Sequence, residues 1–300
     1  MNNQVFAVDP GRHLFKAMNA DGRKLDFEPI VTRYQEQDFD VNLNNQNFRV
    51  KWEKLNHKGE AYETEEYFVG KVARITDGTA LKNTQDGKGH EATAVMVLTA
   101  IHQLGGWGAV KVGIAVPLDT YKSDKEELSR FLTGRHAVTV NGLRRELAFA
   151  QGSVFCFPEG MASYYALPEE EVEGKKVHII NIGSQKSHIM TFDEEMEYIP
   201  AESGSVKNHA WEKKKGTAKE RAEMLALDFK RLTDAKKWNQ VHKNRFDQEV
   251  EKRFFLTGGA AEVSIHAFAA HFPGIQTLPE PLYSDCEGLR QLVIQRYSEE

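Results

Sequence analysis

One short pattern occurs twice in the chain, about 170 residues apart, and it constrains the fold more than any other feature. In each copy an apolar run ends in a polar residue, one spacer and a glycine. Residues 5–11 read Val-Phe-Ala-Val-Asp-Pro-Gly, and residues 177–183 read Val-His-Ile-Ile-Asn-Ile-Gly. A glycine directly after a strand lets backbone N–H groups approach phosphate oxygens, because no Cβ stands in the way. Two copies a domain's length apart predict a duplicated fold that closes over one nucleotide.

The length and composition of the chain fit this prediction. The 300 residues have room for two domains, which we expect at residues 1–153 and 154–300, with a β-rich satellite layer at 22–75 and the C-terminal helix packing back on the first domain. An apolar share of 40% and a charged share of 28% are typical of globular proteins and exclude general disorder. The two cysteines, Cys156 and Cys286, show no CxxC spacing, so neither a disulfide framework nor a zinc site is indicated.

Charge and hydropathy limit the possible partners and the compartment. The net charge of −5 gives no general attraction to nucleic acid or to an anionic membrane, so we expect any contact with DNA to go through a partner protein. The first residues lack a basic-then-apolar signal, and no apolar run approaches the roughly 18 residues that span a bilayer. The sequence therefore predicts a cytoplasmic protein that does not bind membranes.

Periodicity predicts an α/β protein with two sub-sheets. Single strands are expected at 5–8, 67–70, 110–116, 154–157 and 253–256, and strand pairs at 39–43 with 48–52, 136–141 with 144–150, and 177–182 with 187–193. Helices are expected at 91–104, 123–132, 159–167, 217–238, 261–271 and near the C-terminus. Capping boxes at Ser123 with Glu126 and at Thr217 with Glu220 predict two of the helix starts. The helix at 91–104 is expected to bury one face.

Four segments place polar residues and glycines directly after strands. They are Asp9-Pro10-Gly11 with Lys16, Phe157-Pro158-Glu159-Gly160, Asn181-Ile182-Gly183-Ser184, and Leu256-Thr257-Gly258-Gly259-Ala260. In this order, the segments resemble the actin/Hsp70 ATPase superfamily, and most of all its bacterial plasmid-segregation actins of the ParM and AlfA type. The resemblance implies an actin-like fold with ribonuclease H-like duplication, two domains and a nucleotide cleft. It also implies ATP, or GTP, and Mg²⁺ as cofactors.

The resemblance implies binding roles for both turns. Asp9 would hold Mg²⁺ through water, Lys16 would supply a point charge to the phosphates, and the backbone around Gly11 would cradle the β- and γ-phosphates. The remaining implied nucleotide-binding residues follow the same strand ends: Arg12, His13, Gly183, Ser184, Gln185, Gly258, Gly259 and Ala260. Gly258 and Gly259 would let the adenosine lie against the backbone.

Two residues are implied in catalysis. Glu159 stands where these actins carry the carboxylate that positions or activates the attacking water. Asn181 ends a strand that normally ends in aspartate in the family. An amide can bond a water but cannot act as a base, so we expect slow hydrolysis.

Each residue also has a structural explanation. Asp9 could cap a turn, Lys16 could be a solvated lysine, and Glu159 could occupy the first turn of a helix. His178 and His188 are expected to be packing or surface residues, and the lysines at 213–215 to belong to a solvated loop. Taken singly these explanations are at least as good; the order of the four segments favours the functional one.

The resemblance extends to assembly. Only residues of about 200–252 separate the second turn from the adenosine strand, so most of one subdomain of the second domain would be missing, as in AlfA-like actins. A neighbouring subunit could supply the missing contacts. The implied function is a nucleotide-dependent homopolymer that segregates or positions plasmid DNA through an adaptor of the ParR type. The alternatives are an actin-fold small-molecule kinase and a non-hydrolysing nucleotide-dependent scaffold.

Overall fold

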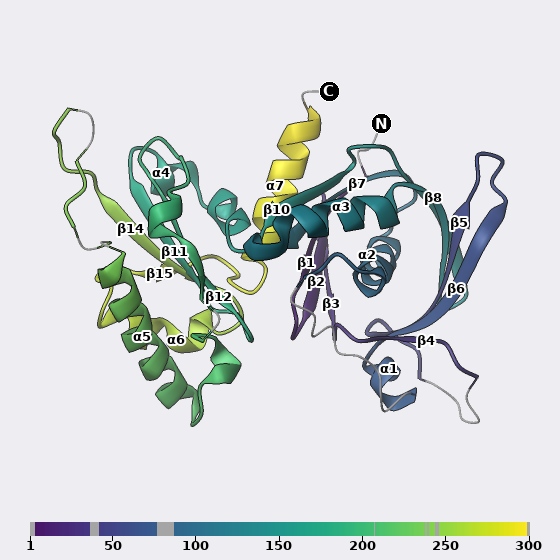
Figure 1. Cartoon of the computed structure of the whole chain (residues 1–300), viewed down its shortest axis with the longest axis horizontal. Coiled ribbons are helices and arrows are strands. Elements are labelled where there is room, and N and C mark those ends of the chain that lie inside the picture. Colours follow the sequence, from purple (N-terminus) through teal and green to yellow (C-terminus); the bar gives the residue numbers. More distant parts are fainter. Residues whose placement is uncertain are drawn as a thin grey trace. The chain divides into compact units, whose positions relative to one another are not determined.

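The computed structural model describes residues 4–36, 42–76, 87–206, 208–236, 238, 240–243 and 246–298. It divides into two compact units, each described here by itself (Figure 1). Unit 1 runs to Pro158 and takes up the chain again from Leu289, and unit 2 is Glu159–Gly288. Each unit has its own sheet, as the periodicity predicted.

Unit 1 is built on a sheet of ten strands among its described residues. The strands are β1 (Gln4–Pro10), β2 (Phe15–Asn19), β3 (Lys24–Phe27), β4 (Val31–Arg33), β5 (Asn47–Leu55), β6 (Ala61–Gly70), β7 (Gly108–Val116), β8 (Gly134–Val140), β9 (Leu143–Phe149) and β10 (Val154–Pro158). Their order is β3-β2-β1-β7-β9-β8-β5-β6-β4, with β10 also paired to β7. Three helices belong to the same unit: α1 (Lys71–Thr76), α2 (Glu91–Gln103) and α3 (Tyr121–Leu132).

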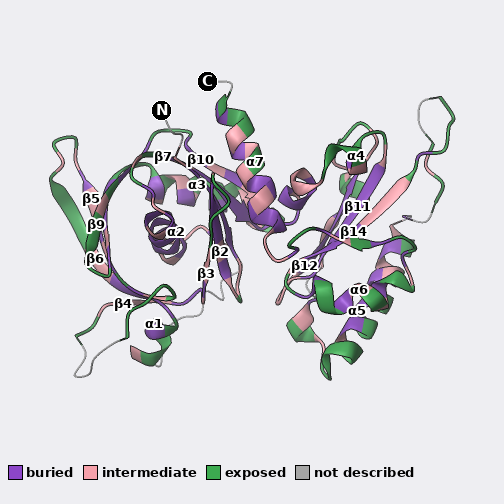
Figure 2. Cartoon of the chain, turned by 180° about the vertical axis from the view of Figure 1, so that it is seen from behind, coloured by how far each residue is buried: buried purple, intermediate pink, exposed green. Residues whose placement is uncertain are grey.

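The helix α2 lies inside the curve of this sheet, as Figure 2 shows. It contacts β1, β2, β5 and β8, and every residue from Thr93 to His102 is buried. The prediction of a helix at 91–104 is confirmed, but the prediction of a single buried face is wrong. A sheet that wraps around a helix removes its whole circumference from water, which a pattern of alternating faces does not anticipate.

Residues 22–75 do not form a separate layer. β5 and β6 pair with each other, and β5 also pairs with β8 of the central sheet. Phe48 and Trp52 of β5 share one core with Phe6 and Val8 of β1. Most of the first strand of the hairpin expected between 39–43 and 48–52 lies outside the described residues; Asn42 and Leu43 are not in a strand, and 48–52 lies in β5.

Unit 2 contains a five-stranded sheet in the order β13-β12-β11-β14-β15. The strands are β11 (Lys176–Asn181), β12 (Ser187–Phe192), β13 (Gly204–Val206), β14 (Lys252–Thr257) and β15 (Gln276–Thr277). The helices α5 (Ala218–Ala235) and α6 (Ala261–Ala269) pack on this sheet through Leu225, Phe229 and Phe268, and the short α4 (Glu169–Val172) lies in the same unit (Figure 1). The helices expected at 217–238 and 261–271 are confirmed, although α5 ends before Trp238.

The two predicted turns follow strands that pair in the same way. β1 is antiparallel to β2 and parallel to β7, and β11 is antiparallel to β12 and parallel to β14. Asp9 and Asn181 therefore stand at equivalent ends of their sheets. The pattern seen twice in the sequence corresponds to one arrangement of three strands in each unit.

Two local predictions differ from the structure. Residues 159–167 contain a 3₁₀ turn at Ala162–Ala166 instead of a regular helix. The capping box at Thr217 forms, but Ser123 lies inside α3, which begins at Tyr121 after a 3₁₀ turn. The Thr120 hydroxyl donates to the Asp124 carboxylate at 2.7 Å. The N-cap position of α3 is therefore Thr120, three residues before Ser123.

The C-terminal helix α7 (Ser284–Ser298) begins in unit 2, and from Leu289 it belongs to unit 1. There Val293 and Tyr297 pack against Val5, and the Tyr297 hydroxyl donates to the carbonyl of Gly152. Among the described helices, none is both long enough and apolar enough to cross a bilayer.

Candidate functional site

The first turn begins with an ion pair across β1 and β2. Asp9 is the last residue but one of β1 and stands directly opposite Lys16 in the register of the two strands. The Lys16 ammonium forms an ion pair with the Asp9 carboxylate, and only 12% and 8% of the two side chains are exposed. The residues that the sequence assigns separately to phosphate and to Mg²⁺ thus lie against each other.

The turn itself requires glycine at position 11. A Cβ on Gly11 would lie 2.5 Å from the carbonyl oxygen of Leu14, and the Gly11 N–H donates to the Asp9 carbonyl at 2.8 Å. Arg12 is half-buried and His13 is exposed. The backbone after β1 therefore turns too tightly for any side chain at Gly11.

A buried lysine, overlooked in the sequence, supports this turn. Lys88 is 1% exposed, and its ammonium donates to the carbonyl of Pro10. The backbone N–H groups of Lys88 and Gly89 each donate to the Asp124 carboxylate at 2.9 Å. Burial lowers the pKa of His90, and the nearby Lys88 ammonium lowers it further. Nδ1 of His90 accepts from the N–H of Thr93 at the start of α2. The Gly-Lys-Gly run before a helix was the available signal.

The second turn is equally tight. A Cβ on Gly183 would lie 2.1 Å from the carbonyl oxygen of Lys186. The carbonyls of Gly183 and Ser184 accept from the N–H groups of Trp211 and Glu212 at 3.0 and 2.9 Å. The side chain of Gln185 donates to the Glu212 carboxylate. Carbonyls of this turn are thereby occupied by the following 3₁₀ turn, Trp211–Lys213.

The predicted catalytic carboxylate faces a histidine. Nε2 of His188 lies 3.5 Å from Oε2 of Glu159, and its Nδ1 is 3.1 Å from the hydroxyl of Ser205. His188 is buried and stands directly opposite Asn181 in the β11–β12 pair. The sequence reasoning treated His188 as a packing or surface residue. The sequence does predict that the two strands pair, and the register of that pair places His188 opposite Asn181.

Asn181 lies between a carboxylate and a glycine turn. Its Nδ2 donates to Oδ2 of Asp285 at 3.1 Å. A Cβ on Gly258, whose φ is +92°, would lie 2.9 Å from Oδ1 of Asn181 and 2.5 Å from the carbonyl oxygen of Ile182. The turn after β14 therefore lies so close to the end of β11 that only glycine fits at position 258. Gly259 is exposed, and Ala260 precedes α6.

The candidate residues thus form two groups, one in each unit. In unit 1 they are Asp9, Gly11, Arg12, His13 and Lys16, all within one hairpin. In unit 2 the strand ends bring Asn181 close to Gly258, and the register places Asn181 opposite His188, the partner of Glu159. These groups offer backbone amides, one ammonium and carboxylates, which suit an anionic ligand and its counter-ion.

Within the described residues, no cluster of three or more histidine, cysteine or acidic side chains could hold a metal by itself. Mg²⁺ in nucleotide sites keeps several waters and takes one or two carboxylates beside the phosphates. A single carboxylate such as that of Asp9 would be enough for this mode of binding.

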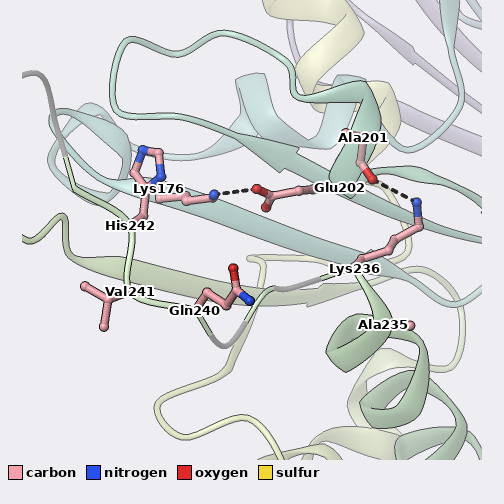
Figure 3. Close-up of a pocket in the computed structure, with 8 residues that line it drawn as sticks. All are labelled: Lys176, Ala201, Glu202, Ala235, Lys236, Gln240, Val241 and His242. Atoms are coloured by element: carbon pink, nitrogen blue, oxygen red, sulfur yellow. Dashed lines mark hydrogen bonds and ion pairs between the residues drawn. The ribbon is translucent and has the colours of Figure 1, made fainter.

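A pocket of about 540 Å³ opens elsewhere in unit 2, and none of the candidate residues lines it (Figure 3). Both of its lysines have partners: the Lys176 ammonium pairs with Glu202 at 2.7 Å, and Lys236 donates to the backbone carbonyl of Ala201 at 3.2 Å.

The family is defined by the sequence and the fold together. A model of the N-terminal domain of actin-like proteins matches residues 7–161, slightly more than half of the chain. The chain belongs to the actin-like proteins. No curated protein sequence matches it.

Solved structures of filament proteins share the fold over the full length. A 15-stranded ParM filament from Clostridium botulinum has a TM-score of 0.73 at 15% identity, covering 98% of this chain and 100% of that one. The AlfA filament from the B. subtilis plasmid pLS32 has a TM-score of 0.69 at 14% identity, with 96% and 98% covered. An AlfA filament bound to AMPPNP has a TM-score of 0.66 at 16% identity, with 99% and 98% covered. The resemblance to ParM- and AlfA-type actins is confirmed, and the fold is a mixed α/β actin-like fold with two sheets.

Proposed function

We propose that this protein binds ATP, or GTP, with Mg²⁺, assembles with copies of itself into filaments, and hydrolyses the nucleotide slowly. The main support is the repeated strand arrangement. Each unit ends a central strand in a polar residue and continues into a turn where a Cβ on Gly11 or Gly183 would collide with backbone. Such turns bring N–H groups close to phosphate oxygens. An AlfA filament of similar fold was solved with a nucleotide analogue.

The chain's own residues have distinct tasks in this proposal. Lys16 would exchange part of its contact with Asp9 for a phosphate oxygen, and Asp9 would hold Mg²⁺ through water. When bound, Mg²⁺ would neutralise charge on the phosphates. Lys88 would keep the carbonyl of Pro10 turned away from the phosphates, since its ammonium donates to that oxygen. The backbone of residues 183–185 and 258–260 would hold the second phosphate turn and the adenosine.

Glu159 would hold the attacking water, and His188 would orient it. The 3.5 Å contact between their side chains restrains the Glu159 carboxylate on one side. Asn181 keeps a polar atom near the same strand end but cannot accept a proton as a base. The proton of the water would therefore go to Glu159, and the rate would depend on that single carboxylate.

Assembly would be the readout of nucleotide binding. Proteins of this fold have been solved as ParM and AlfA filaments, and this chain would likewise form a homopolymer. The short segment at about 200–252 would lack most of one subdomain, so a neighbouring copy would complete the contacts to the base. Because the net charge is −5, plasmid DNA would be joined through a ParR-type adaptor protein.

The test is right-angle light scattering of the purified protein after addition of Mg-ATP, with phosphate release followed in the same sample. We expect scattering to rise first and phosphate to follow. Scattering without phosphate would favour a non-hydrolysing scaffold. No scattering at any concentration, together with ADP formation that requires a sugar or an acid, would replace the proposal with a small-molecule kinase.

A further inference from the structure

A second buried carboxylate lies beside the proposed catalytic residues of unit 2. Asp285, at the start of α7, is 6% exposed. Its Oδ1 accepts from the backbone N–H and the hydroxyl of Ser163 at 3.1 and 2.6 Å. Its Oδ2 accepts from the N–H of Gly160 at 3.2 Å and from Nδ2 of Asn181 at 3.1 Å. Four donors satisfy the capacity of one ionised carboxylate.

The four donors come from two segments that the carboxylate joins. Gly160 directly follows Glu159, and Ser163 lies in the 3₁₀ turn behind it. Asn181 ends β11, where the second phosphate turn begins. Asp285 therefore fastens the backbone that carries Glu159 to the end of the strand that carries Asn181. The neighbouring hydroxyl of Ser284 contacts Ser163 and Thr257, which ties the end of β14 to the same cluster.

The backbone of Gly160 packs closely against β12. Its φ of +81° favours glycine, and a Cβ there would lie 3.2 Å from the Cβ of His188. His188 in turn contacts Glu159. The position of the Glu159 side chain is thus determined by His188 at its tip and by Asp285 through the N–H of the next residue.

The charge of the cluster explains the asparagine at 181. An amide at this position donates to Asp285, whereas an aspartate would place two carboxylates about 3 Å apart in a buried site. Two buried carboxylates at that distance cannot both stay ionised without a large rise in one pKa. One amide, at Asn181, and one carboxylate, at Asp285, therefore complement each other as hydrogen-bond donor and acceptor.

We propose that Asp285 is a positioning residue for the hydrolytic carboxylate Glu159, and that Asn181 and Asp285 act as one complementary pair. This inference rests on the proposed ATPase function. It assigns to Asp285 no contact with the nucleotide. The pair of Asn181 and Asp285 sets the distance between the segment that carries Glu159 and the second phosphate turn.

The test is an exchange of the two residues, with three variants compared with the wild-type chain: D285N, N181D and the double variant N181D/D285N. In D285N an amide replaces the carboxylate, and one amide oxygen cannot serve all four donors. We expect phosphate release at saturating Mg-ATP to fall by roughly 10- to 100-fold, the size expected when a reacting group is misplaced by a fraction of an ångström to one ångström. The affinity for ATP should change by less than about threefold, because Asp285 supports the hydrolytic group and not the binding backbone.

N181D and the double variant give readouts that a merely structural role would not produce. In N181D the two carboxylates must share a proton, so phosphate release should recover as the pH is lowered from 8 towards 5.5, unlike that of the wild type. In N181D/D285N the carboxylate and the amide change places, which restores the contact between 181 and 285 but leaves the Gly160 N–H without its carboxylate acceptor. Phosphate release should therefore exceed that of D285N while staying below that of the wild type. The variant D247N is the control, because Asp247 lies in the same unit and forms an exposed ion pair with Lys243; it should leave phosphate release unchanged.

The outcomes distinguish failure of the proposed ATPase function from failure of the positioning role of Asp285. If the wild-type chain binds no ATP or releases no phosphate, the proposed function fails, and the positioning role fails with it. If the wild type hydrolyses ATP and D285N does so at the same rate, only the positioning role is overturned. If the double variant is no better than the worse single variant, the complementary pair is overturned, even where D285N is slow.

Discussion

The two strand-end turns of this protein have the same backbone arrangement, but their side chains differ in charge. In unit 1 the last polar residue of the strand is a carboxylate, Asp9, and the residue opposite it, Lys16, is a cation that pairs with it. In unit 2 the strand ends in an amide, Asn181, and the residue opposite is His188, which contacts Glu159. The carboxylate of the second turn comes from Asp285, 104 residues away in the sequence.

This difference indicates a division of labour. Strand pairing and glycine placement make both turns able to approach an anion, so the shape is common to the two units. The ionised pair in unit 1 suits phosphate and Mg²⁺, whereas unit 2 holds its carboxylates in a buried network around the proposed hydrolytic group. Substitutions in the first turn should therefore affect binding and assembly, and those in the second should affect turnover.

The largest effect is expected from Asp9→Ala. The change removes the proposed Mg²⁺ ligand and the carboxylate that pairs with the Lys16 ammonium, whose side chain is 12% exposed; losing one side of a largely buried pair costs up to about 3–5 kcal/mol. Light scattering should show no assembly with Mg-ATP, and thermal unfolding should shift to lower temperature. Glu223→Ala removes one side of an exposed pair with Lys219 and should alter stability by less than about 1 kcal/mol. Assembly of the Asp9 variant at the wild-type concentration would contradict the assignment of the first turn.

Glu159→Gln should separate assembly from turnover. The amide keeps the shape but cannot accept a proton, and loss of a general base typically slows a reaction by about 10²–10⁴-fold. We expect phosphate release to fall by that factor while scattering with Mg-ATP persists. Phosphate release at the wild-type rate would mean that the second turn is not where hydrolysis is supported, and the division of labour would fail.

Gly258→Ala tests how closely the turns in unit 2 must pack. At a φ of +92°, with the new Cβ 2.5 Å from the carbonyl oxygen of Ile182, we expect a loss of roughly 2–4 kcal/mol in unfolding free energy. Gly259→Ala is the matched control, because its Cβ would lie 3.7 Å from Leu282, an ordinary contact. Denaturant unfolding of both variants measures the difference. Equal stabilities would show that the turn can relax.

Acid should weaken both cores through neutral histidines. Burial lowers the pKa of His102 in unit 1 to about 4, and burial with nearby Lys176 lowers that of His178 in unit 2 well below 6.5. Each group binds its proton more readily when unfolded, so stability is full above pH 6.5 and falls as the pH drops towards 4, by at most about 1.4 kcal/mol per pH unit for each histidine.

The variant His178→Phe separates the two contributions. Phenylalanine can occupy the stack between Trp238 and Phe254 and removes a buried Nε2 that makes no hydrogen bond to any described residue. Unfolding free energy measured from pH 4.5 to 7 should depend less steeply on pH than in the wild type, while the contribution of His102 remains. An unchanged slope would show that His178 does not titrate in this range.

The smallest effect is expected at two similar capping signals. Thr217→Ala removes a formed capping box at the start of α5 and should cost about 1 kcal/mol. Ser123→Ala, at the matching signal in unit 1, should cost less than about 0.5 kcal/mol, because Ser123 lies inside α3 and donates to the Thr120 carbonyl. Comparing denaturant midpoints tests both. Equal losses would mean that Ser123 supports its helix after all.

Local patterns were sufficient for the elements whose causes are local. The strands leading to Asp9 and Asn181, the β8–β9 and β11–β12 pairs and the Thr217 cap all follow from alternation, turn residues and capping chemistry within a few positions. The same patterns misjudged α2 and the strands at 22–75. Their burial depends on a sheet that curves around a helix, and no window of neighbouring residues encodes that enclosure.

The candidate site divides in the same way. The sequence by itself determined the two glycine turns and their polar strand ends, because a tight turn needs glycine wherever it occurs. Only the tertiary structure decided that Lys16 pairs with Asp9, that Lys88 supports the first turn, that His188 contacts Glu159, and that Asp285 bonds Asn181. The last three contacts join residues 29 to 104 positions apart, and in all four hydrogen bonding and burial select the partner, because a buried polar group must find one wherever the fold brings it.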